Sequence, residues 1–190
     1  MKTYWKTIPE DFTSNGHRWE MNKWFKVDGE IQCCKNGFHY SPTIMEAWGY
    51  VTPGWVSEVE VRGDRDDQGD KSACREMRLI RRAHMDDVIA RKIAIYAAEL
   101  ALPIFEEEYP DDKRPRNAIE TAKKYLRGKA TKEELDAARD AAWDAAWEAA
   151  SASASASARD AAWDAAWEAA RDAIMKKIHN YAKGLLFNAK

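Results

Sequence analysis

Twelve residues of this chain occur twice, and this internal repeat restricts the fold more than any other feature of the sequence. Residues 139–150 and residues 159–170 both read RDAAWDAAWEAA, and four Ser-Ala pairs at 151–158 separate them. Half of each copy is alanine, the residue with the highest helix propensity, and neither copy contains glycine or proline. The repeat therefore predicts alanine-rich helix on both sides of the Ser-Ala tract.

The length of this stretch bears on how the two copies are connected. A single helix from Thr131 to Leu186 would be about 80 Å long at 1.5 Å per residue. A compact domain does not accommodate such a helix, so we expect a break in the Ser-Ala tract and antiparallel packing of the two repeats. Because alanine and serine can also continue a helix, the choice between loop and helix at 151–158 stays open.

On a helix, the repeat sorts its side chains into rows, because residues four apart lie nearly above one another. In the first copy one row is acidic, the next holds Arg139, Trp143 and Trp147, and the other two are alanine. The first interpretation is packing, in which alanines allow close contact and tryptophans fill the gaps beside them. The alternatives are an aromatic and acidic wall for a cationic or base-containing ligand, and a mimic of nucleic acid.

Composition and charge exclude several classes of protein. The 190 residues are 45% hydrophobic with a net charge of −2, which suffices for a core and argues against bulk nucleic-acid binding. The charge is balanced locally as well, with 13 basic and 13 acidic residues in 1–82 and 17 and 19 in 83–190. There is no run of about 18 apolar residues and no apolar signal core, so we expect no membrane span and a cytoplasmic location.

Cysteines and histidines give little sign of a metal or a catalytic site. Cys33 and Cys34 are adjacent and Cys74 is distant, a pattern that suits neither a disulfide framework nor a zinc knuckle. The four histidines have no partner at short spacing, and no nucleophile elbow or phosphate-binding glycine loop occurs. We therefore predict no metal ligands, no catalytic residues and no cofactor.

The first part of the chain, residues 1–82, predicts a small antiparallel β domain. Residues 55–61 alternate with period two, and residues 77–80 are a second strand candidate. Asp28-Gly29 predicts a two-residue hairpin between 24–27 and 30–33. Residues 44–50 follow Ser41-Pro42 and predict a short helix, whereas the polar segment 63–72 predicts a mobile loop.

The second part, residues 83–190, predicts an all-α, alanine-rich domain, which makes the fold class α+β. Apolar residues of 88–100 fit one helical face, Pro103 should disturb that helix, and Tyr109-Pro110 should end it. Pro115 favours a helix start and Gly128 a helix end. Thr131 and Glu134 form a capping-box pattern that opens the next helix.

Two blocks of the second part resemble a helical family of bacterial immunity proteins. They are LPIFE at 102–106 and RPRNAIE at 114–120, and the resemblance covers roughly residues 84–187. The resemblance implies the helical fold more than an activity. Arg114 and Arg116 in the second block are interpreted either as helix-start ion pairs or, for Arg116, as a ligand-binding residue.

The first part resembles a small domain of unknown function that is common in bacteriophage proteins. The matching residues are CKNGFH at 34–39, Tyr50, Pro53-Gly54, EVE at 58–60, Gly63 and DKS at 70–72. The resemblance implies a phage or prophage gene, and hence the cytoplasm of the host cell. Phage accessory proteins of this size often act on host defences, so the resemblance implies a role against host immunity.

Residues 37–50 followed by EVEVRG at 58–63 are also similar to the middle of the ADP-ribosyltransferase fold of poly-ADP-ribose polymerases. By that similarity Tyr50 would stack on nicotinamide and His39 would stand at a pocket tyrosine. Glu76 would take the place of the catalytic glutamate, and His17 lies on the side of the NAD-binding histidine. The alternative interpretation also stays open, in which His39 is a structural histidine beside a strand and Tyr50 and Trp48 are core residues.

These observations lead to one main hypothesis and two alternatives. The main hypothesis is a phage-encoded accessory protein that counters host immunity by sequestering a nucleotide-like signal or by blocking a host defence protein. An aromatic would stack on a base and arginines would pair with phosphate. The candidate ligand-binding residues are Tyr50, His39, Trp48, Arg116 and Arg159. The alternatives are an ADP-ribosyltransferase-like enzyme acting on NAD and a structural protein that forms homo-oligomers through its alanine-rich helices.

Overall fold

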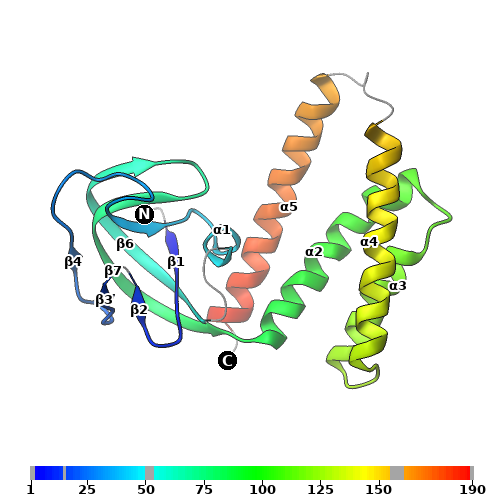
Figure 1. Ribbon diagram of the computed structural model, residues 1–190, viewed down its shortest axis with the longest axis horizontal. Coiled ribbons are helices and arrows are strands. Elements are labelled where there is room, and N and C mark those ends of the chain that lie inside the picture. Colours follow the sequence, from blue (N-terminus) through cyan, green and yellow to red (C-terminus); the bar gives the residue numbers. More distant parts are fainter. Residues whose placement is uncertain (1–2, 15, 50–53, 155–160, 189–190) are drawn as a thin grey trace. The chain divides into compact units, whose positions relative to one another are not determined.

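The computed structural model describes residues 3–14, 16–49, 54–154 and 161–188. It contains an N-terminal antiparallel sheet followed by helices, which confirms the α+β prediction (Figure 1). The chain forms two compact units. The sheet unit comprises Met1–Ile89 and His179–Lys190, and the helical unit comprises Ala90–Ile178. The boundary at residue 82 stays a prediction.

The sheet is built around one long hairpin. Strand β6 (Gly54–Asp67) pairs with strand β7 (Ser72–Met85), and β1 (Tyr4–Ile8) pairs with the other edge of β6. The second edge of β7 pairs with β4 (Phe25–Lys26) and β5 (Phe38–Tyr40). Strands β2 (Thr13–Ser14) and β3 (His17–Arg18) form a separate two-stranded ribbon.

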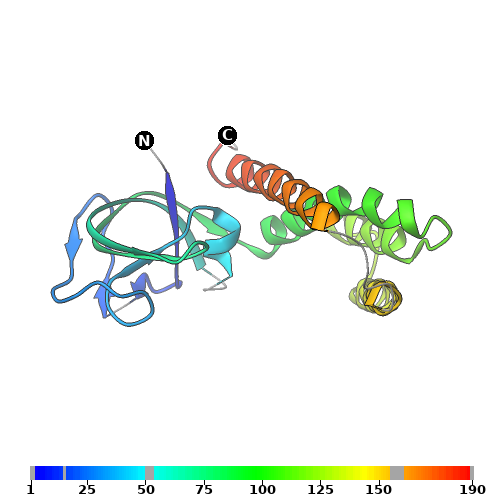
Figure 2. The same cartoon turned by 90° about the horizontal axis from the view of Figure 1, so that it is seen from above.

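The sheet curls until its edges meet. Trp5 of β1 exchanges two backbone hydrogen bonds with Ser41, the residue after β5, at 2.9 and 2.8 Å. Because β5 is bonded to β7, the path from β1 through β6, β7 and β5 returns to β1. Bulges in the β6–β7 register after Glu58 and after Arg62 increase the curvature (Figure 2).

The core of the sheet unit lies inside this curl. It is made of side chains that are almost completely inaccessible to solvent, namely Ile8, Trp19, Phe38, Tyr40, Val59, Cys74, Met77 and Leu79.

The close approach of β1 and β6 requires a glycine at the start of β6, since a Cβ at Gly54 would lie 2.3 Å from the backbone oxygen of Ile8. The two strands at 55–61 and 77–80 are confirmed as parts of β6 and β7.

Two predictions for this unit are wrong. Residues 24–27 and 30–33 do not form a hairpin, because Phe25 pairs with Met77 of β7 and packs its ring 4.9 Å from that of Trp19. Residues 63–72 are not a mobile loop, because β6 continues to Asp67 and β7 begins at Ser72. At this end of the hairpin the β6 side is polar and mostly exposed, whereas Ser72, Ala73 and Cys74 at the start of β7 are buried. Arg75 pairs there with Asp64 at 2.6 Å.

The short helix is confirmed as α1 (Ile44–Trp48). A capping box between Thr43 and Glu46 begins it. The backbone N–H of Ile44 donates to Nδ1 of His179 at 3.1 Å. His179 belongs to the last turns of α5 (Ala161–Phe187), and Phe187 of the same helix lies 5.4 Å from the ring of Trp5. The end of α5 is therefore part of the sheet unit.

The helices begin and end close to the predicted residues. Helix α2 (Asp87–Glu108) continues through Pro103 and ends before Tyr109, and α3 is Arg114–Leu126. Helix α4 (Lys132–Ala154) begins with the capping box of Thr131 and Glu134. In the part of the chain that the structure describes, no helix is long and apolar enough to cross a membrane.

The two copies of the repeat fall mainly in separate helices, α4 and α5. The middle of the Ser-Ala tract, where a break was expected, lies outside the described residues, and antiparallel packing of the repeats stays a prediction. In the first copy Ala145 is buried, whereas the side chains of Trp143 and Trp147 are 72% and 68% exposed. These two tryptophans therefore do not fill gaps in the core of the helical unit.

Candidate functional site

A cavity of about 240 Å³ opens in the sheet unit beside β1, β5 and α1. Its lining contains two lysines, a histidine and a cysteine, together with hydroxyl-bearing and aromatic side chains. The lining residues are Trp5, Lys6, Thr7, Ser14, Cys34, His39, Tyr40, Ser41, Ala47 and Lys71. This set of described residues includes no carboxylate, and its lysines, Lys6 and Lys71, are the basic side chains of the lining.

Lys6 is the most unusual side chain of the cavity because it is a buried lysine, with 6% of its surface exposed. It lies on β1, which is bonded to β6 on one side and to Ser41 on the other. Its Nζ donates to the backbone oxygen of His39 at 3.2 Å and lies 5.5 Å from the centre of the Trp19 ring. Burial lowers the pKa of Lys6 to about 8, since an ammonium group is poorly solvated there.

The backbone oxygen of His39 accepts the hydrogen bond from Lys6, and the imidazole ring of His39 is itself a hydrogen-bond acceptor. Its Nε2 accepts the backbone N–H of Cys34 at 2.8 Å, which assigns the ring proton of the neutral form to Nδ1. Burial lowers the pKa of His39, and the positive charges of Lys6 and Lys71 lower it further. The imidazole is therefore neutral at neutral pH.

The two adjacent thiols lie at the same place and differ from each other. Cys34 is exposed, and a hydrogen bond from Lys71 lowers the pKa of its thiol. Burial raises the pKa of Cys33, and its backbone N–H donates to Oδ2 of Asp66 at 2.8 Å. The sulfur atoms of both cysteines and a ring nitrogen of His39 lie within 4.8 Å of one another.

Several hydroxyl groups of the lining are fixed by the fold. Thr7 donates to the backbone oxygen of Ala47 at 2.6 Å, and Oγ of Ser14 accepts the indole N–H of Trp19 at 2.7 Å. Tyr40 donates to Asp67 at 3.0 Å, and burial raises the pKa of this phenol. Thr7 and Tyr40 use their hydroxyl protons in these bonds, whereas Ser14, which accepts there, can still donate its proton. A free hydroxyl donor beside two ammonium groups suits phosphate or carboxylate oxygens.

A second hollow, of about 430 Å³, lies in the helical unit. Helices α2, α3 and α4 line it, mostly with alanine and other apolar side chains: Ala94, Ile95, Ala98, Ala118, Ile119, Ala122, Tyr125, Leu135 and Ala142. Charged lining residues are Arg91, Lys132, Arg139 and Asp136. The guanidinium of Arg91 lies 5.1 Å from the centre of the Tyr125 ring. This hollow is an apolar groove with a net positive rim.

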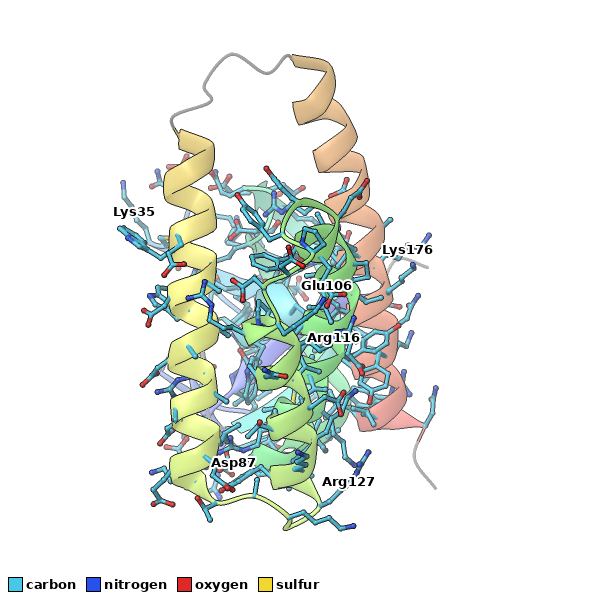
Figure 3. The ribbon with its side chains drawn as sticks, turned by 90° about the vertical axis from the view of Figure 1, so that its right-hand side faces the viewer. Lys35, Asp87, Glu106, Arg116, Arg127 and Lys176 are labelled. Atoms are coloured by element: carbon cyan, nitrogen blue, oxygen red, sulfur yellow. The ribbon has the colours of Figure 1, made fainter. Side chains whose placement is uncertain are left out.

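Of the three predicted site residues that the structure describes, His39, Trp48 and Arg116, only His39 lines the cavity. Trp48 is half-buried in α1 and is not among the lining residues, although its neighbour Ala47 is. Arg116 pairs with Glu106, with Nε 2.7 Å from Oε1, and thereby connects α3 to α2 (Figure 3). Tyr50 and Arg159 lie outside the described residues.

The residues carried over from the ADP-ribosyltransferase similarity are not gathered in one cavity. The predicted order of strand, short helix and strand is present as β5, α1 and β6. Glu76, however, pairs with Arg62 at 2.6 Å on the outer hairpin and does not line the cavity of His39. The ring of His17 packs against Phe25 and Phe38, at 5.8 and 5.3 Å.

Sequence reasoning missed Lys6, Lys71 and the two thiols. A lysine in a strand is usually exposed, so the letters YWKTI at 4–8 give no sign that both sides of β1 are covered. One sequence pattern could have indicated that His39 lies near the thiols: Cys34 and His39 are five residues apart, with Gly37 between them. Gly37 has a φ of +127°, and the turn that it permits returns His39 to the thiols.

Comparison with known families supports the division of the chain into two parts. Residues 2–91 match the family described as "Domain of unknown function (DUF7666)". Residues 83–172 match the family described as "Imm-5 like putative immunity protein". The helical part is therefore similar to proteins of the immunity type, and both resemblances seen in the sequence are confirmed. No curated protein and no solved structure matches the chain significantly.

Proposed function

We propose that this chain is a binding protein of the immunity type that captures the anionic end of a small molecule in the cavity beside Lys6. The observation that carries the proposal is a buried ammonium group that opens onto a cavity lined without carboxylates. Burying a charge is unfavourable unless an opposite charge or several hydrogen bonds compensate for it. A bound phosphate or carboxylate would supply that compensation.

The size of the cavity indicates how much of a ligand it takes. Its volume of about 240 Å³ is below the range of roughly 300–1,000 Å³ that is typical for sites enclosing drug-sized ligands. The cavity would thus enclose a phosphate group and leave a base or sugar at its mouth. A nucleotide-like signal fits this description, and its sequestration would give the chain an anti-defence role in an infected cell.

Calorimetric titration of the full chain tests the proposal. The probes are inorganic pyrophosphate, cyclic dinucleotides and the corresponding nucleosides, which lack phosphate. We expect the phosphate compounds to bind and the nucleosides to show no binding. Lys6→Met should weaken phosphate binding at least about tenfold, which corresponds to 1.4 kcal/mol.

Lys176→Met is the matched control, because Lys176 is an exposed lysine of α5 (Figure 3). It should bind the probes as the unchanged chain does. The proposal is wrong if no phosphate compound binds, or if Lys6→Met and Lys176→Met bind equally well. Incubation with NAD separates the enzyme alternative, since release of nicotinamide that His39→Ala abolishes would favour a transferase.

A partner protein is the second candidate, and the groove of the helical unit favours it. This groove lies within the part that matches the immunity family, and its rim has three basic side chains against one acidic side chain. An apolar helix with acidic flanks would complement both its surface and its charge. Fluorescence anisotropy with acidic and basic amphipathic peptides tests this. Acidic peptides alone should bind, and Ala122→Leu should weaken their binding by filling the groove.

A further inference from the structure

Cys33, Cys34 and His39 form a cluster at the edge of the cavity whose metal-ligating atoms the proposed capture of an anion does not use. The two cysteines lie in the turn between Gln32 and Asn36, and His39 lies on β5. One potential ligand atom from each residue lies within 4.8 Å of the other two. Among the described residues this is the one group of three or more metal-ligating side chains so arranged.

The backbone holds this cluster in place without any ligand. Gln32 and Asn36 exchange backbone hydrogen bonds of 2.9 and 2.8 Å across the turn. The side chain of Asn36 donates to the backbone oxygens of Asp28 and Glu30, and Asp66 accepts the N–H of Cys33. Cys34 has a φ of +68°, an unfavourable conformation for a non-glycine residue that this network stabilises.

The chemistry of the three side chains selects a class of metal. Two sulfur ligands and one imidazole are preferred by Zn²⁺ and by Cu⁺, and are unsuited to Mg²⁺ or Ca²⁺. With Zn–S distances of about 2.3 Å, two sulfurs of a tetrahedral site are roughly 3.8 Å apart. The ligand atoms lie within 4.8 Å of one another, so the sulfurs need approach each other by no more than about 1 Å to reach that separation.

His39 presents its Nε2 lone pair to this turn. The atom accepts the N–H of Cys34 at 2.8 Å, and a metal would replace that contact. A metal ion would form three coordinate bonds, to two thiolates and an imidazole, in place of that single hydrogen bond. The exchange therefore favours the metal.

We propose that Cys33, Cys34 and His39 bind one thiophilic metal ion of the Zn²⁺ class at the mouth of the cavity. Three protein ligands leave one coordination position of a tetrahedral ion for water or for a bound molecule. Cys34 and His39 also line the cavity of the anion proposal, but Lys6 is not a metal ligand, so the two proposals can be tested separately.

Titration of the reduced full chain with Zn²⁺, in competition with a chromophoric chelator, tests this proposal. We expect one ion per chain. Cys33→Ser, Cys34→Ser and His39→Ala should each weaken binding by more than the roughly 10–100-fold that loss of an outer-shell partner costs. With Co²⁺ as the probe, a thiolate-to-metal absorption band should appear and should be lost in both cysteine variants.

Two further variants keep the test decisive. Cys74→Ala removes a thiol that is buried in the core and does not belong to the cluster, so it should retain the full affinity. Lys6→Met should retain Zn²⁺ affinity even if it abolishes phosphate binding, which separates the two proposals. Zn²⁺ affinity in a folded Cys33→Ser, Cys34→Ser double variant that equals the original, with folding checked by circular dichroism, would overturn the metal site.

Discussion

The sheet unit and the helical unit are stabilised in different ways. The sheet unit buries large side chains such as Trp5, Phe38 and Met77 almost completely. Among described residues of the helical unit, the buried set is Ile93, Ile119, Ala145 and Ile178. Ion pairs supplement this small set, for example Lys123 with Glu99 at 2.7 Å. A densely packed core can hold a preformed cavity, whereas a thin apolar layer between helices leaves a groove that can adapt to a partner.

The largest expected effect is the loss of folding stability when a core residue of either unit is truncated to alanine. Phe38→Ala should destabilise the protein by about 3–5 kcal/mol, because a fully buried ring is removed from a dense core. Ile119→Ala should cost about 2 kcal/mol, at the lower end for such changes, because its surroundings are rich in alanine. Denaturant unfolding measures both. Equal losses would contradict the comparison.

The next effect is a gain of stability within the sheet unit. Burial lowers the pKa of Lys6 from 10.5 to about 8, so the fold loses stability as pH falls from 10.5 to 8 and carries the full penalty below about pH 8. Lys6→Met should stabilise the protein at pH 7 by up to roughly 3 kcal/mol, at about 1.4 kcal/mol per unit of pKa. Thermal unfolding checks this. A loss of stability would mean that the ammonium is well compensated in the fold itself.

A smaller effect is expected on acidification. Burial lowers the pKa of His179 below its ordinary value of 6.5, and its Nδ1 accepts a hydrogen bond from Ile44. The unfolded chain therefore binds a proton at a higher pH than the folded chain, so stability falls as pH decreases from 6.5 through the folded pKa. His179→Gln should reduce this slope in urea unfolding at several pH values.

The smallest effect concerns the exposed tryptophans of the helical unit. Replacing Trp143 and Trp147 by Gln should change stability by no more than about 0.5 kcal/mol each, because their side chains are mostly exposed. Thermal unfolding together with light scattering is the measurement. A large loss of stability, or a change from oligomer to monomer, would show that these side chains are covered in solution.

The sequence predicted those elements whose own residues determine them. The alternation at 55–61, the capping box of Thr131 and Glu134, and the short helix after Pro42 are local signals, and all three are confirmed. The failures depend on distant partners. Asp28-Gly29 indicates a hairpin locally, but the edge of β7 offers Phe25 a better-packed position.

The candidate site was less predictable than the fold for the same reason. Lys6 is buried because the sheet closes through Trp5 and Ser41, a contact between residues 36 positions apart in the chain. Arg116 belonged to a recognisable motif, but its charge is paired with Glu106. Only His39 could be selected in advance, because its strand resembled part of a known nucleotide-binding fold.

The packing of the end of α5 against β1 and α1 has a consequence for biosynthesis. His179 and Phe187 contact Ile44 and Trp5, and all of residues 90–178 are translated between these two groups. On the ribosome the sheet unit would therefore emerge first but acquire its final contacts last. A nascent chain that ends before residue 179 should keep the Trp5 side of the sheet open to chaperones until synthesis continues.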